Sequence, residues 1–186
     1  MCGISGFYSI NAFDFNNAIL KMSSALSHRG PDSSRTWKDK NSGIIFGHQR
    51  LSILDLTKAG DQPMFSKSKR FVITFNGEIY NHLEIRNKLG EINPNIKWKS
   101  GTDTETLLEA IEILGIKKTL EIAVGMFAFV IWDVGKQELF AARDKLGIKP
   151  LYYVVRGDQL LCASEIKSLF ASGLCAPQLN DFRLPE

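Results

Sequence analysis

The sequence predicts an α+β fold in which antiparallel sheets are buried by helices. Strand patterns and amphipathic helix patterns come in blocks along the chain, without the strict β-α-β alternation of a parallel sheet. Three strand patterns in the C-terminal third follow one another at short spacing, as in an antiparallel meander. Hydrophobic residues make up 44% of the 186 residues, so the chain can bury a substantial core.

The first 75 residues predict a strand, a helix and two further strands. Residues 4–9 predict a short strand. Asp14 precedes apolar residues at helical spacing, so we expect it to cap a helix that the Gly-Pro-Asp run at 30–32 ends. Runs rich in Ile, Phe and Val predict buried strands over 43–47 and 71–75.

Helix signals fill the middle of the chain. Asn81 is placed to begin a helix that Gly90 ends. Thr102 and Glu105 have the spacing of a capping box and begin a second helix, which Gly115 closes.

The last third returns to strands. The almost wholly apolar run 126–132 predicts a strand covered on both faces. The runs 138–142, 151–155 and 160–163 predict the meander, and a last helix is expected over 165–171.

Composition and charge argue against several classes of protein. Lys and Arg number 23 against 20 Asp and Glu, and this small, scattered excess does not indicate a nucleic-acid partner. No apolar run approaches the roughly 20 residues that span a bilayer, and the first residues lack a secretory signal. The chain has three cysteines, Cys2, Cys162 and Cys175, and this small, odd number argues against a disulfide framework. We therefore expect free thiols and a cytoplasmic location.

Cys2 follows the initiator methionine, and two interpretations fit its position. Removal of Met1 would leave a thiol and a free α-amine on one residue, which is the nucleophile and base of N-terminal nucleophile enzymes. The amine has a reference pKa of about 7.7–8.0, so part of it is neutral near pH 7. The alternative is a small, buried, apolar cysteine near the terminus.

Two segments at strand ends carry further candidates. Arg50 ends an apolar strand, where its guanidinium can hold a carboxylate through two hydrogen bonds or form an ordinary surface ion pair. Asn76 and Gly77 follow the predicted strand 71–75 directly. Their side-chain amide and backbone N–H can converge as an oxyanion hole, or the Asn-Gly pair is a bare turn.

Two carboxylates complete the candidate set. Glu78 comes next in the chain and can receive a substrate ammonium. Asp103 opens the second predicted helix, where the helix dipole alone also explains an acidic residue. Together the candidates fit an α-amino acid with an amide side chain. Arg50 would bind its carboxylate, the two acids its ammonium, and Cys2 its side-chain carbonyl.

Five ordered motifs cover nearly the whole chain. They are Met-Cys-Gly-Ile-Ser-Gly-Phe, His-Gln-Arg-Leu-Ser-Ile-Leu-Asp-Leu, Gly-Asp-Gln-Pro-Met, Phe-Asn-Gly-Glu-Ile-Tyr-Asn and Ala-Arg-Asp-Lys-Leu-Gly-Ile-Lys-Pro-Leu-Tyr-Tyr. With these motifs the chain, from Cys2 to about Ala171, resembles the glutaminase domain of class II glutamine amidotransferases. It is most similar to that of glutamine-hydrolysing asparagine synthetases.

The resemblance implies a four-layer αββα sandwich of two antiparallel sheets, the N-terminal nucleophile hydrolase fold. It implies hydrolysis of L-glutamine to glutamate and ammonia through a γ-glutamyl thioester on Cys2, with Asn76 and Gly77 as oxyanion donors. No metal or organic cofactor is expected for this half-reaction. The residues implied to bind glutamine are Arg50, Ile53, Asn76, Glu78 and Asp103.

The resemblance also divides the chain. Residues 1–175 correspond to the glutaminase domain, and 176–186 to the start of a linker to an ATP- and Mg²⁺-dependent synthetase domain. No segment resembles the pyrophosphate-binding loop of that domain, so we expect the synthetase in cis in a longer protein or in trans on another chain. The resemblance does not identify the acceptor of the ammonia, and it leaves open whether the chain forms a homodimer.

Two other functions remain as alternatives to glutaminase activity. A non-catalytic module of the same fold would bind glutamine or serve for docking without turning it over. An N-terminal nucleophile amidase with another substrate is less compatible with Arg50, Glu78 and Asp103, because these residues require a free amino-acid head group.

Overall fold

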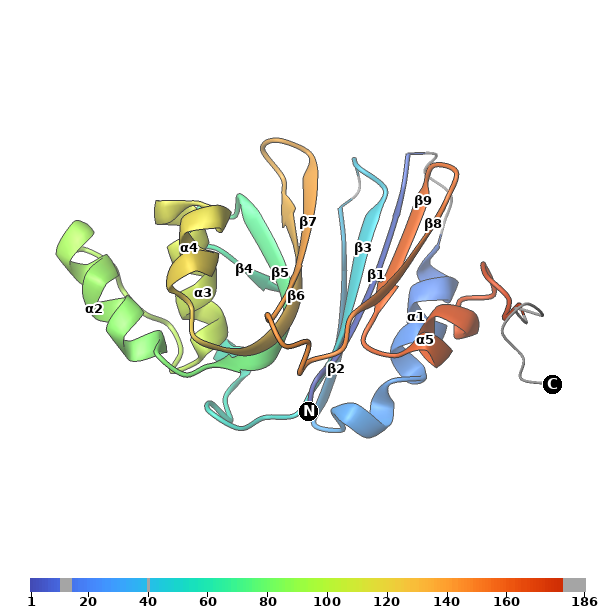
Figure 1. The fold of residues 1–186 in the computed structure, drawn as a ribbon, viewed down its shortest axis with the longest axis horizontal. Helices are drawn as coiled ribbons and strands as arrows, with labels where there is room; N and C mark the ends of the chain where they lie inside the picture. The colour runs from blue at the N-terminus through green and yellow to red at the C-terminus, as the bar shows by residue number, and fades with distance from the viewer. Residues whose placement is uncertain (11–14, 40, 179–186) are drawn as a thin grey trace.

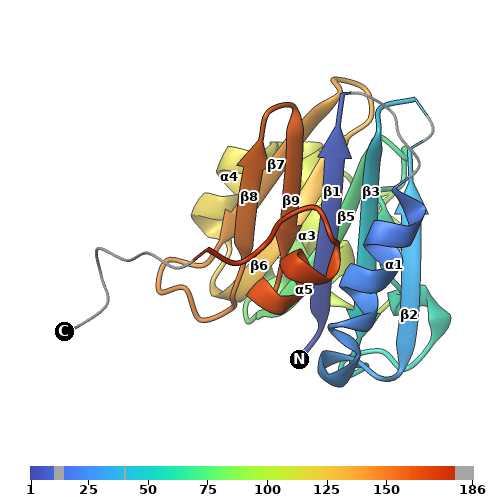
Figure 2. The ribbon, with the colours of Figure 1, turned by 90° about the vertical axis from the view of Figure 1, so that its right-hand side faces the viewer.

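The chain folds into four layers (Figure 1). The computed structural model describes residues 1–10, 15–39 and 41–178. Two antiparallel sheets pack face to face, and helices cover the outer face of each, as Figures 1 and 2 show from two directions. The predicted α+β class and the αββα sandwich are therefore confirmed.

The first sheet has five strands in the order β2-β3-β1-β9-β8. Its outer face packs on two helices through a buried apolar cluster that includes Phe7, Ile19, Met22 and Leu169. The strands are β1 (Gly3–Ser9), β2 (Ser33–Lys38), β3 (Ile44–Arg50), β8 (Tyr152–Arg156) and β9 (Gln159–Ala163), and the helices are α1 (Asn16–Ser24) and α5 (Ile166–Ala171). A 3₁₀ turn, η1 (Ser27–Arg29), follows α1.

The second sheet has four strands in the order β4-β5-β6-β7. Its strands are β4 (Met64–Phe65), β5 (Phe71–Ile79), β6 (Gly125–Asp133) and β7 (Glu138–Arg143). Three helices lie on the outer side of this sheet: α2 (His82–Ile92), α3 (Asp103–Leu114) and α4 (Ile116–Ile122). A second 3₁₀ turn, η2 (Lys58–Gly60), precedes β4.

The layer between the sheets determines where the candidate residues meet. Side chains alternate along a strand, and Ile4 and Val72 point into this layer. Phe46 of β3 points there too, and Cys2, Arg50 and Asn76 stand at even spacing from Ile4, Phe46 and Val72 along the respective strands, so they belong to the same faces. The start of β1 pairs with the end of β3, because Gly3 lies opposite Gln49. These side chains therefore gather at one end of the inter-sheet layer.

Two predictions for the helices were wrong. Gly90 lies inside α2 and does not end it. Asn81 makes no side-chain cap: its amide donates to the Ile122 oxygen at 2.9 Å and its oxygen accepts from the Val124 N–H at 2.9 Å. These tertiary bonds join Asn81 to the segment that connects α4 with β6, and they take the place of the local cap. The predicted cap Asp14 lies outside the described residues.

The predicted meander is wrong at one step. β7 and β8 belong to different sheets, so only the β8–β9 hairpin continues as expected. The strand over 71–75 is also longer than predicted, because β5 runs on to Ile79. The predicted linker over 176–186 remains a prediction, and its residues 179–186 lie outside the described part of the chain.

Asp144 stabilises the segment of the chain that connects β7 of the second sheet to β8 of the first. Its carboxylate accepts backbone N–H groups from four residues, at 2.9–3.2 Å: Phe127, Leu146, Ile148 and Lys149. Burial raises the pKa of this carboxyl, but the four donors outweigh burial, and the pKa lies below its usual value. The segment that brings Lys149 back towards the N-terminus is thus fixed by one carboxylate.

We expect Asp144→Ala to lower the free energy of unfolding by about 2–4 kcal/mol, because it leaves buried backbone donors unpaired. Urea unfolding measures the change, and the exposed neighbour Lys145→Ala serves as control. A depressed carboxyl pKa stabilises the fold above the ordinary aspartate value of 3.8. The difference should therefore shrink as the pH falls below that value, and a difference that grows in acid would contradict this role.

Candidate active site

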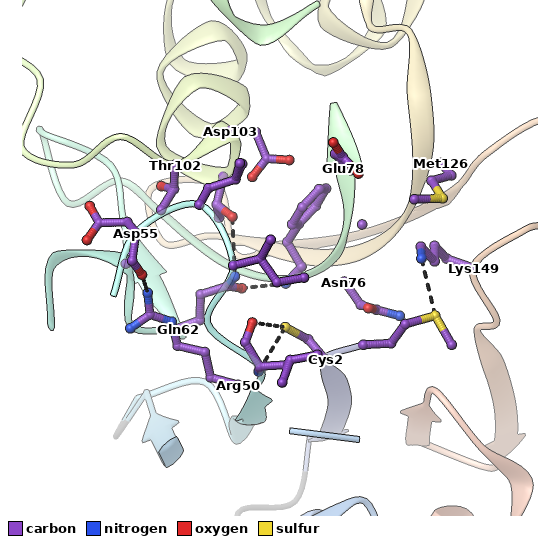
Figure 3. Close-up of a pocket in the computed structure, with 18 residues that line it drawn as sticks. Cys2, Arg50, Asp55, Gln62, Asn76, Glu78, Thr102, Asp103, Met126 and Lys149 are labelled. Atoms are coloured by element: carbon purple, nitrogen blue, oxygen red, sulfur yellow. Dashed lines mark hydrogen bonds between the residues drawn. The ribbon is translucent and has the colours of Figure 1, made fainter. Parts of the chain in front are cut away.

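A pocket opens at the end of the inter-sheet layer (Figure 3). It is built from the start of β1, the end of β3, the end of β5 and the start of α3. All the residues predicted for the site line this one pocket: Cys2, Arg50, Ile53, Asn76, Gly77, Glu78 and Asp103. The structure therefore brings together residues that the sequence separates by up to a hundred positions.

Cys2 lies half-buried on the floor of the pocket. The Leu51 N–H lies 3.4 Å from its Sγ, and Sγ lies 3.7 Å from the Leu51 oxygen. Arg29 Nε donates to the Cys2 carbonyl oxygen at 2.9 Å and so fixes the backbone. Burial raises the pKa of the Cys2 thiol, although the Leu51 backbone and the positive N-terminus oppose it. The thiol therefore needs a base to become a nucleophile near neutral pH.

The free edge of β5 presents a row of backbone N–H groups to the pocket. The Phe127 N–H and oxygen are both bonded to Asp144 on the β7 side. Phe127 lies opposite Gly77, so this is a non-hydrogen-bonded pair and the Gly77 N–H points away from β6. On the same edge the Phe75 N–H donates to Gln62 Oε1 at 2.7 Å, and the Ile79 N–H to Asp103 Oδ2 at 2.8 Å.

Gly77 lies between these two bonded positions, and its N–H faces the pocket. A Cβ at position 77 would lie 2.5 Å from the Met126 oxygen, so only glycine lets the strands approach this closely. The bare turn considered for Asn76 and Gly77 is wrong, because both residues lie inside β5.

Asn76 supplies a second donor beside Gly77. Its side chain is 2% exposed, and among the described residues its Nδ2 has no hydrogen-bond partner. A buried amide donor without a partner costs free energy, unless a ligand completes it. The Asn76 amide and the Gly77 N–H together can stabilise a negatively charged oxygen near Cys2.

Two carboxylates form the opposite wall of the pocket, as Figure 3 shows. Asp103 is 4% exposed and opens α3, whereas Glu78 is exposed at the mouth. Burial raises the pKa of the Asp103 carboxyl, the Ile79 N–H opposes this, and nearby Glu78 raises it further. A cationic group between the two acids would relieve their repulsion, which suits a substrate ammonium.

Arg50 is held on the third side by its own network. Its Nη1 donates to the Thr57 oxygen and to Asp61 Oδ1, both at 2.8 Å, and Nη2 donates to the Asp55 oxygen. A Cβ at position 60 would clash with Nη2, so Gly60 leaves room for the guanidinium. These bonds leave Nε–H and one Nη2–H of the five guanidinium donors for a ligand.

Several residues around the site were not predicted from the sequence. Gln62 lines the pocket and orders β5, and Asp61 anchors Arg50; both lie in the Gly-Asp-Gln-Pro-Met motif, which was the available signal. Lys149 also lines the pocket, with Nζ 3.2 Å from Met1 Sδ. His28 lies outside the pocket, on the surface, and its Nε2 is hydrogen-bonded to Glu165 Oε1 at 2.9 Å.

A family model described as a glutamine amidotransferase domain matches residues 1–186. A glutamine-hydrolysing asparagine synthetase of Bacillus subtilis is 40% identical, and the match covers 97% of this chain and 24% of that protein. A putative asparagine synthetase of Methanocaldococcus jannaschii is 37% identical over 92% of this chain and 35% of its own length. The amidase chry2 of Gibberella zeae is 35% identical over 97% of this chain and 29% of its own length. The chain thus spans between a quarter and about a third of these relatives.

Solved structures support the fold. The glutamine phosphoribosylpyrophosphate amidotransferase of B. subtilis superimposes with a TM-score of 0.74 at 21% identity, over 92% of this chain and 44% of that one. A structure of the allosteric regulatory enzyme of purine biosynthesis gives a TM-score of 0.71 at 21% identity, over 92% and 43%. None of the helices in the described ranges is long and apolar enough to cross a membrane.

Proposed function

The chain belongs to the glutamine amidotransferase domain family, and on this premise we propose that it hydrolyses L-glutamine with Cys2 as nucleophile. The observation that carries the proposal is a pair of donors that line the same pocket as the Cys2 thiol: the Gly77 N–H and the Asn76 amide, whose Nδ2 has no partner among the described residues. The acids on one wall and Arg50 on another are complementary to the head group of a free amino acid.

The proposed reaction begins after Met1 is removed. The α-amine of Cys2 takes the thiol proton, and Sγ attacks the side-chain carbonyl carbon of glutamine. Asn76 and Gly77 stabilise the oxyanion of the tetrahedral intermediate. The amine returns the proton to the departing nitrogen, so ammonia leaves and a γ-glutamyl thioester remains. Water then hydrolyses this thioester and releases glutamate, which restores the thiol.

The relatives suggest where the ammonia goes. Two of them carry the name asparagine synthetase and are about three to four times as long as the matched region. We therefore propose that ammonia passes to an ATP- and Mg²⁺-dependent synthetase region, in cis or in trans, in the cytoplasm. One relative is named an amidase, so an ammonia acceptor other than that of an asparagine synthetase is an alternative.

Wild-type protein should release ammonia and glutamate from L-glutamine in equal amounts. In Arg50→Lys the charge stays but the planar fork is lost, so we expect KM to rise roughly ten- to hundred-fold with little change in kcat. Steady-state assays of ammonia release measure both constants, and a thermal melt checks that the variant is folded.

Two results would change the proposal. Calorimetry that finds glutamine bound but never hydrolysed would identify a non-catalytic binding module. An unchanged KM in Arg50→Lys would show that the α-carboxylate binds elsewhere, and would favour an amidase with another substrate.

A further inference from the structure

The Arg50 guanidinium already has an anion of its own. Its ion pair with Asp61 spans 2.8 Å, and both side chains are 8% exposed. A closed Arg–Asp pair carries no net charge and attracts a second carboxylate only weakly. The proposed binding of the glutamine carboxylate therefore requires that Asp61 does not neutralise Arg50 fully.

Arg35 provides the missing charge from the neighbouring strand β2. Its Nη2 lies 2.5 Å from Asp61 Oδ2, while Arg50 takes Oδ1 of the same carboxylate. One carboxylate is thus shared by two guanidinium groups, and the trio keeps one net positive charge. Arg35 itself is half-exposed, on the far side of Asp61 from the pocket.

The other carboxylates around this trio have different partners. Asp55 accepts the N–H groups of Thr57 at 2.8 Å and Gly101 at 3.1 Å, and Asp32 accepts the Ser52 N–H at 2.7 Å. Lys58 and Asp32 line the same hollow. Among the described residues neither Asp55 nor Asp32 forms an ion pair with Arg50 or Arg35, so Asp61 is the carboxylate that the two guanidinium groups share.

We propose that Arg35 is a positioning residue for glutamine recognition, acting through Asp61. By sharing Asp61, it leaves Arg50 with an uncompensated charge for the α-carboxylate of the substrate. This inference rests on the proposed glutaminase function and adds a residue that never touches the substrate. It predicts an effect on the affinity for glutamine and none on the chemical step.

The test compares two arginines at opposite edges of the same sheet. Arg35→Met should raise KM for glutamine roughly three- to ten-fold, with kcat unchanged within about twofold, because a screened charge is lost near the carboxylate site. Arg35→Lys should restore a KM near the wild-type value. Arg156→Met on β8 removes the same charge at the far edge and should leave KM unchanged.

Binding without turnover separates this inference from the proposed function. Calorimetric titration of glutamine into Cys2→Ala protein, with and without Arg35→Met, should show the same three- to ten-fold loss of affinity. An unchanged affinity, or an equal loss in Arg156→Met, overturns the role of Arg35 and leaves the glutaminase intact. Wild-type protein that neither binds nor hydrolyses glutamine overturns both.

Discussion

Cys2→Ala is expected to abolish release of ammonia from glutamine, with a loss of at least about four orders of magnitude in kcat. The variant lacks the only proposed group that forms the thioester, and alanine cannot replace a thiol as nucleophile. Glutamine binding should persist, because Arg50, Glu78 and Asp103 are unchanged. An enzyme-coupled ammonia assay and calorimetry on the same preparation measure the two properties.

Cys175 offers the matched control for this variant. It is a free, partly buried cysteine whose Sγ bonds the Leu169 oxygen, remote from the pocket. Cys175→Ala removes one thiol as well and should retain full activity. If Cys2→Ala keeps more than a few per cent of the wild-type rate, the nucleophile lies elsewhere.

Asn76→Ala is expected to lower kcat roughly 10²- to 10³-fold, with a small change in KM. The amide would act only on the oxyanion, which forms after glutamine is bound, so its loss falls on the chemical step. The melting temperature of Asn76→Ala should fall no further than that of an ordinary buried Asn→Ala variant, because Nδ2 loses no protein partner. Steady-state kinetics and a thermal melt test both statements.

Thr74 is the control for the Asn76 prediction. It is fully buried, lies two residues earlier on the same face of β5, and does not line the pocket. Thr74→Val should leave kcat within about twofold. An Asn76→Ala protein with normal kcat would show that the oxyanion is stabilised by other donors.

Much of the fold could be predicted because local pattern and tertiary role agree. β6 is apolar along most of its length and is covered on both faces, and α3 begins where Thr102 Oγ1 accepts the Glu105 N–H. β2 could not be predicted, since its sequence Ser-Ser-Arg-Thr-Trp-Lys is polar and half-exposed. It becomes a strand through its pairing with β3.

The site shows the same division. Its lining residues could be predicted from ordered motifs at strand and helix ends, including Cys2 and Arg50. The residues that hold them could not, because Gln62 and Asp61 act through contacts between loops and strands. Gly77, the proposed oxyanion donor, shows why: the direction of its N–H follows from the pairing of Phe127 with Asp144, which no local pattern around Gly77 contains.

The most direct test of the central claim is intact-mass and peptide analysis of wild-type protein quenched in acid during glutamine turnover. We predict a chain that lacks Met1 and carries one γ-glutamyl group, mapped to the N-terminal peptide on Cys2. Active protein that retains Met1, or an adduct on another residue, would contradict Cys2 as the N-terminal nucleophile.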